Sequence, residues 1–281
     1  MHGKLIGFGA LVASLGSTPA LATPARTGLN HRSVMYGRVA PKGLLLESEL
    51  SWPEALDAEG GFLLESSHLD VGLALSITPV HVGYGFVVEV EPAAFLVLRA
   101  RGLRTHYFGT LGSVYELGDT DADWSPERLE RISDADLGHT AEGFLFDASA
   151  QLRLAVGMPG PLLVVDARWS WTWIDARGAF YEPYSGLLLE PDDLVTSVWA
   201  ILGWRTSPWF VVGARWQLEV AQADDDARHT LGVAALWTLP HAPCEPAFGL
   251  IGLVGVYVDD PYREHHPFFA LGVSLEYGVP E

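Results

Sequence analysis

The sequence of 281 residues contains one cysteine, Cys244, and comparatively few basic residues. A single cysteine excludes a disulfide within the chain, and no spacing of cysteine and histidine matches a zinc site. We therefore expect no metal and no cofactor, and we interpret Cys244 as an incidental thiol. The 17 Lys and Arg residues stand against 35 Asp and Glu, and this net charge of −18 argues against nucleic acid as a partner.

Long apolar runs are also missing, although 49% of the residues are hydrophobic and only 19% are charged. No window approaches the ~20 consecutive apolar residues that a membrane-spanning helix needs. The apolar residues lie instead in short runs that alternate with polar ones. This distribution favours a β-structure over a helix bundle.

The N-terminal segment has the features of a secretory signal peptide. His2 and Lys4 form a short basic start, an apolar run follows, and Ala20-Leu21-Ala22 has the small-x-small form of a cleavage site. We expect cleavage after Ala22, which leaves residues 23–281 as a single domain.

The stretch 142–175 gives the clearest structural signal, because apolar and polar side chains alternate there in two runs separated by 157–160. Side chains of a strand alternate between its two faces, so both runs are predicted to be strands with one apolar and one polar face. The apolar face of the second run carries Leu163, Val165, Ala167, Trp169, Trp171 and Trp173, whereas its polar face carries Asp166, Arg168, Ser170 and Thr172.

An even number of loop residues, either 159–160 or 158–161, keeps the polar faces of this hairpin matched. The register that follows sets four pairs opposite one another: Arg153 with Asp166, Gln151 with Arg168, Ala150 with Trp169 and Ala148 with Trp171. Pairs of opposite charge and of small against large side chains stabilise neighbouring strands.

Many short strands with turn signals between them predict a sandwich or a barrel. Beyond the hairpin, nine segments have strand character: 43–50, 62–77, 80–91, 94–107, 194–205, 210–220, 230–239, 247–258 and 268–277. A weaker one at 33–39 brings the total to about twelve, with ten or fourteen as alternatives. In the segment 194–205 the odd-numbered and the even-numbered residues are both apolar, so the sequence does not decide which of them face outward.

The connections alternate between short and long from 108–141 onward, and the long ones are acidic. Short links at 157–160, 206–208 and 240–246 alternate with longer ones at 176–193, 221–229 and 259–266. Membrane barrels have short periplasmic turns and longer external loops, whereas a soluble sandwich has no reason for such alternation. Within 108–141, Ser125-Pro126-Glu127 predicts the start of a short helix.

The last predicted strand, Gly272-Val273-Ser274-Leu275-Glu276-Tyr277, resembles the closing strand of bacterial outer-membrane β-barrel proteins, Gly-x-x-apolar-x-aromatic. Ala270 departs from the family pattern, where a polar residue is usual, and four residues follow the aromatic one. The resemblance implies an antiparallel transmembrane barrel in the outer membrane. It also implies an even number of strands, contact with outer-membrane lipid, and recognition of this strand by the barrel-assembly machinery.

In such a barrel the tryptophan face of 161–175 meets lipid and the polar face lines the lumen. About twelve strands enclose more space than the eight that side chains can fill, so we expect a narrow or partly plugged lumen. The candidate lumen-lining residues are His68, His81, Arg99, Arg101, Asp147, Arg153, Asp166, Arg168, Arg215 and Glu219. Mixed charges of this kind either select small solutes or brace the wall.

Two alternatives to a passive channel or structural barrel remain open. The first is an outer-membrane lipid-modifying hydrolase, with Ser76 or Ser149 as nucleophile and His68, His81 or His106 as base. No G-x-S-x-G segment supports it, and we predict no catalytic residues. The second is a soluble periplasmic β-sandwich or ligand-binding barrel, which would have its apolar faces packed inward.

Overall fold

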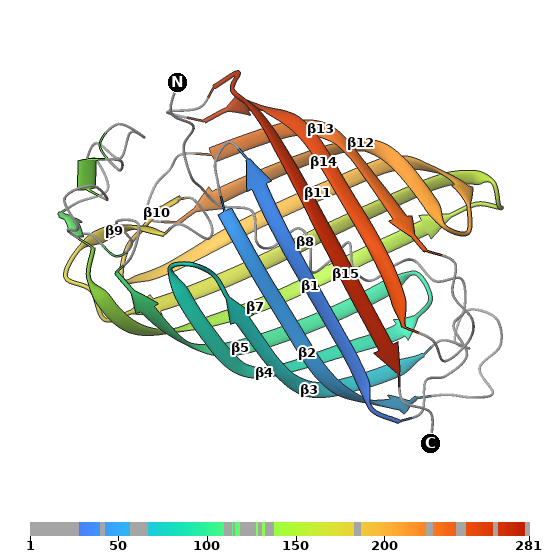
Figure 1. Cartoon of the computed structure of the whole chain (residues 1–281), viewed down its shortest axis with the longest axis horizontal. Helices are drawn as coiled ribbons and strands as arrows, with labels where there is room; N and C mark the ends of the chain where they lie inside the picture. The colour runs from blue at the N-terminus through green and yellow to red at the C-terminus, as the bar shows by residue number, and fades with distance from the viewer. Residues whose placement is uncertain are drawn as a thin grey trace.

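The computed structural model describes residues 28–39, 43–56, 67–109, 138–182, 187–222, 227–239, 246–260 and 264–278, with short stretches at 114, 116–118, 128 and 131–132. Twelve strands form a closed antiparallel barrel (Figure 1). They are β1 (Asn30–Val39), β2 (Gly43–Ala55), β3 (His68–Ile77), β4 (His81–Ala93), β5 (Leu96–Phe108), β7 (Thr140–Ala155), β8 (Gly160–Ile174), β11 (Asp192–Ser207), β12 (Phe210–Ala221), β13 (Ala227–Thr238), β14 (Ala247–Asp259) and β15 (Pro267–Gly278).

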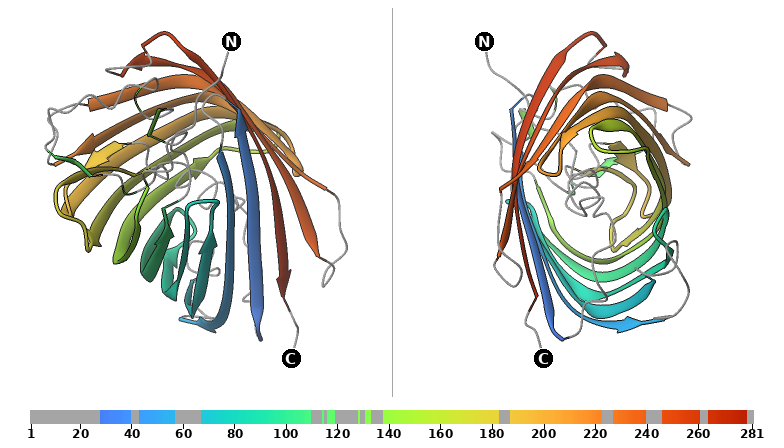
Figure 2. Two further views of the ribbon diagram at one scale, coloured as in Figure 1. Left: turned by 60° about the vertical axis from the view of Figure 1, so that its left-hand side comes forward. Right: turned by 90° about the vertical axis from the view of Figure 1, so that its right-hand side faces the viewer.

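The strands follow one another around the wall in chain order, and β15 closes the barrel against β1. This seam is continuous, from Asn30 opposite Gly278 to Val39 opposite Phe269. Figure 2 shows the closed wall end-on and the strong tilt of the strands. The prediction of an all-β barrel with twelve strands is confirmed, and the weak segment 33–39 is one of them. The predicted signal peptide lies outside the described residues.

The register predicted for the hairpin of β7 and β8 is wrong by two residues. Asp166 lies opposite Gln151 rather than Arg153, Trp169 lies opposite Ala148, and the other two pairs shift in the same way. The turn is centred one residue earlier than expected, where Gly157 has a φ of 69° and Val156 N–H donates to the Pro161 carbonyl. Because the error is an even number of residues, each side chain keeps the predicted face.

The outer surface of the barrel is apolar. Trp169, Trp171 and Trp173 are 41–44% exposed, and Leu73 in the middle of β3 is 60% exposed. A soluble barrel would bury these side chains, so the alternative of apolar residues packed inward is wrong. No helix among the described residues is long and apolar enough to cross a membrane.

Exposed aromatic side chains gather toward both ends of this surface. Near the strand ends that carry the long connections, the Phe144 ring lies 6.0 Å from that of Trp173, and Trp171 Nε1 donates to Asp192 at 2.5 Å. Toward the other end, Trp52, Trp204, Trp237 and Phe248 are exposed. Two such girdles flanking an apolar band are typical of a transmembrane barrel, because an amphipathic ring suits the membrane–water interface.

The interior is less uniformly polar than the sequence predicts. A buried apolar cluster runs from β1 and β2 through β15, β14 and β13 to β11 and β8, and it includes Tyr36, Trp199, Ile251 and Phe268. The open question about 194–205 is resolved, since Trp199 and Ile201 point inward while Leu202 and Trp204 point outward. The charged side chains gather mainly on the inner side of β1 to β8.

The connections at the seam end where Asn30 meets Gly278 include 94–95, 156–159 and 208–209, all short, but also 56–67. The opposite end carries the long connections 109–139 and 175–191, together with short ones at 40–42 and 78–80. The alternation of short and long connections therefore holds from 94 to 209. It fails beyond that, because 239–246 at the seam end is longer than both 222–226 and 260–266 at the opposite end. Asp192 and Asp193, which the sequence assigned to a connection, belong to β11. Arg128, Arg131 and Ile132 are helical, as predicted.

The lipid-facing assignment is tested by placing a charge in the middle of the apolar band. We expect Leu73→Arg to lower the free energy of unfolding in phospholipid vesicles by about 2–4 kcal/mol, because a cation at the bilayer midplane is poorly solvated. Glu54→Arg, near the end of β2, is the matched control and costs about 0–1 kcal/mol. Urea titration, followed by tryptophan fluorescence and by the gel mobility shift on boiling, measures both. Equal costs would contradict the membrane placement.

Candidate functional site: the charged interior

The structure places all ten predicted lumen residues on the inward face of the wall. Arg101, Asp147, Asp166, Arg168, Arg215, Glu219 and His81 are 1–7% exposed, and Arg99, Arg153 and His68 are partly buried on the same face. Burial of so many ionisable groups is costly unless they pair. The pairs they form define the chemistry of the interior.

Arg101 on β5 is bound to two carboxylates. Its Nη1 lies 2.5 Å from Oε1 of Glu47, and its Nη2 lies 2.6 Å from Oδ2 of Asp147. Asp147 is on the adjacent strand β7, but β3 and β4 separate β5 from the strand of Glu47 in the wall. The pair between Arg101 and Glu47 therefore crosses part of the interior.

A second set of pairs lies closer to the seam end. Arg99 binds Glu49 on β2 and also Glu89, at 3.0 Å. Arg32 on β1 donates to Glu49 at 2.7 Å and lies 3.8 Å from Glu89. These contacts join β1, β2, β4 and β5 through their side chains, in addition to the backbone ladder.

Smaller pairs continue the charged lining on the neighbouring strands. Arg153 lies 3.7 Å from Glu91, and its Nε donates to Gln151 at 2.5 Å. Far around the wall, Arg228 on β13 binds Glu219 on β12 at 2.5 Å.

A pocket with room for about one water molecule opens on the inner wall along β5, β7 and β8. Arg99, Arg101, Asp147, Ser149 and Arg168 line it. Three guanidinium groups around one pocket, with one carboxylate, favour small anions or the negative end of a polar solute.

The sequence did not single out Glu47, Glu49, Arg32 or Arg228, although each is part of these pairs. Glu47 and Glu49 alternate with Leu46, Ser48 and Leu50, and this alternation could have predicted that both glutamates face inward. Arg32 was missed because the predicted first strand started at 33 rather than at Asn30.

Of the five candidate catalytic groups, Ser76, Ser149, His68 and His81 are on the inner face, and His106 is not. His106 is exposed on the outer surface, whereas Ser76 is buried on the inner one. His81 Nδ1 lies 3.2 Å from Thr78 Oγ1, and its ring is 5.2 Å from that of Tyr107. Ser149 stands among the arginines of the pocket.

Apolar side chains pack together at the end of the barrel that carries the long connections. Here β9 (Ala179–Glu182) joins β6 (Glu116–Gly118) and β10 (Leu187–Leu189) in a small separate sheet (Figure 1). Phe180, Leu187 and Leu189 pack with Tyr107, Val114, Ile174, Val195 and Ala221 in one buried cluster, which we call the loop cap. Phe180 is fully buried.

Comparisons with known proteins identify the fold. Neither models of protein families nor curated protein sequences give a match. The β domain of the Bordetella autotransporter BrkA is similar in structure, with a TM-score of 0.53 at 10% identity over 90% of this chain and all of that one. An outer membrane channel from Pseudomonas putida F1 gives 0.49 at 11% identity over 92% and 97%, and LpxR from Salmonella typhimurium gives 0.44 at 10% over 89% and 100%.

The chain therefore has the fold of the bacterial outer-membrane β-barrels, as the closing strand implied. The apolar outer band and its girdles agree with a place in the outer membrane. Recognition of β15 by the assembly machinery stays a prediction.

The ion pairs of Arg101 with Glu47 and Asp147 are tested by removing Arg101, the cation that the two carboxylates share. We expect Arg101→Met to lower the free energy of unfolding by about 3–5 kcal/mol, because Glu47 and Asp147 keep buried charges without their partner. The triple variant R101M/E47Q/D147N removes those charges as well and should regain most of the loss. Urea unfolding of the three proteins in vesicles decides the matter. A triple variant as unstable as Arg101→Met would show that the charges are not the cause.

Proposed function

We propose that the protein is a passive outer-membrane channel for small polar solutes, with a narrow interior that its own side chains and the loop cap largely occlude. The observation that carries this proposal is the charged lining. Arginines and carboxylates from β1, β2, β4, β5, β7 and β8 face the interior of a twelve-stranded barrel. Opposed charges across a narrow passage select solutes by size and charge.

The same pairs also support a structural barrel. Links such as Arg101 with Glu47 brace β5 against β2, and a barrel used only as a scaffold would need no more than that. A hydrolase has less support, since the pocket beside Ser149 is lined by arginines and Asp147, with no histidine among the described lining residues.

Ion conductance separates the channel from the scaffold. We expect the refolded protein in planar bilayers to give small, discrete current steps. The double variant F180A/L189A removes much of the loop cap and should raise the conductance several-fold, because the wall strands do not depend on those two side chains.

The double variant F86A/L73A on the lipid face is the matched control for this experiment, since it removes the same apolar volume without touching the interior. It should leave the conductance unchanged. If the folded protein and the cap variant both fail to conduct, the channel proposal is overturned in favour of a structural barrel.

A further inference from the structure

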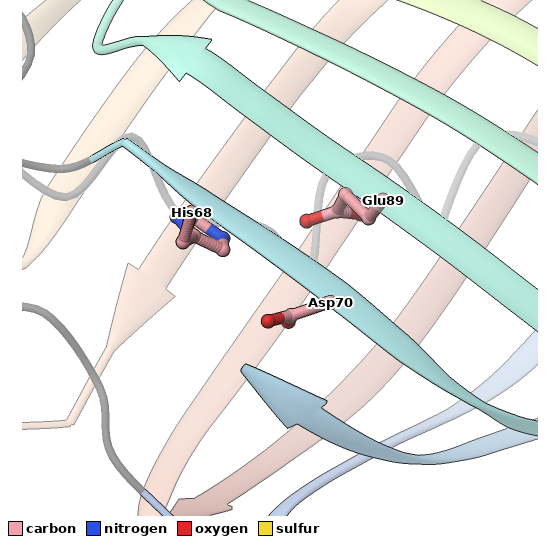
Figure 3. A group of neighbouring side chains, drawn as sticks. All are labelled: His68, Asp70 and Glu89. Atoms are coloured by element: carbon pink, nitrogen blue, oxygen red, sulfur yellow. The ribbon is translucent and has the colours of Figure 1, made fainter. Parts of the chain in front are cut away.

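We propose that His68, Asp70 and Glu89 form a binding site for one divalent transition-metal ion of the zinc class, on the inner wall near the seam end of the barrel. Each residue offers one ligand atom, and the three atoms lie within 4.8 Å of one another. Figure 3 shows the three side chains on two neighbouring strands. The proposal does not depend on whether the barrel conducts.

The register of β3 and β4 creates this group. Asp70 is directly opposite Glu89, and His68 is opposite Glu91, which makes His68 the diagonal neighbour of Glu89. All three side chains are on the inward face and partly buried, and the Glu89 side chain is 15% exposed. The sequence spacing predicted no metal site, because His68 and Glu89 are close only once the strands pair.

Two carboxylates directly opposite each other on one face of a ladder repel each other. Arg32 and Arg99 both approach Glu89 through the same atom, Oε2. On Asp70, Oδ2 accepts a long hydrogen bond of 3.4 Å from Ser51. A divalent cation held between the two carboxylates would neutralise their mutual repulsion.

The donor set indicates the class of ion. One imidazole nitrogen with two carboxylate oxygens suits Zn²⁺ and the neighbouring transition metals, whereas Ca²⁺ prefers six to eight oxygens. Three protein ligands leave at least one position for water. The nearby guanidinium of Arg99 weakens binding, since it competes with the ion for Glu89.

The test is Zn²⁺ titration of the refolded, detergent-solubilised protein by calorimetry, in a H265A/H266A background that removes an exposed histidine pair. We expect one saturable Zn²⁺ per barrel, displaced by a chelator and not by excess Ca²⁺. H68A and D70N should each weaken binding at least about tenfold. R99Q should tighten binding several-fold, a gain that a merely structural role of these residues would not produce.

His106→Ala on the outer face is the matched control and should leave the affinity unchanged. The gel mobility shift on boiling verifies that each variant is folded, and D70N serves where H68A does not fold. The proposal is overturned if the background protein shows no saturable Zn²⁺ binding, or if folded H68A or D70N binds Zn²⁺ as tightly as the background protein. Neither result would bear on conductance, which is measured without zinc.

Discussion

Everything in this molecule depends on the pairing of backbone groups without water. In the hydrocarbon layer an unpaired N–H or C=O costs several kcal/mol, so strands can span it only if the sheet closes on itself. The seam between β1 and β15 meets this requirement, with ten successive residues of β1 paired along it. Alternation then follows, because each strand of a closed wall has one side facing lipid and the other facing the interior.

Closure also explains why the interior can hold so many ions. A wall hydrogen-bonded all round has no freedom to collapse onto its contents, so the side chains must complement one another in place. Ion pairs line the inner side of β1 to β8, with a further pair of Arg228 and Glu219 on β13 and β12. Apolar side chains pack from β8 round to β2. The contacts of Arg101 join strands that the backbone ladder keeps apart, which adds rigidity that hydrogen bonds along the wall cannot supply.

Sequence reasoning predicted the features that depend on periodicity and missed those that depend on register. The alternation of polar and apolar residues around Asp166 and Trp169 is visible in the sequence. It predicted which side chains of β8 face outward, and it supported a transmembrane barrel. The two-residue shift in the hairpin depends on the backbone at Gly157, which composition does not reveal. Trp199 was undecidable because both parities of its strand are apolar. The proximity of Glu89 to His68 arises only after β3 and β4 pair.

The seam has one more consequence, for the connectivity of the chain. Since Asn30 and Gly278 are partners in adjacent strands, the barrel is a ring in which the position of the chain break is arbitrary. A short linker across that seam, with new ends at the tight connection 208–209, would give a circular permutant with the same ladder of strands. In that protein β15 would lie in the middle of the chain, so the predicted recognition of this strand by the assembly machinery could be measured separately from its part in the wall.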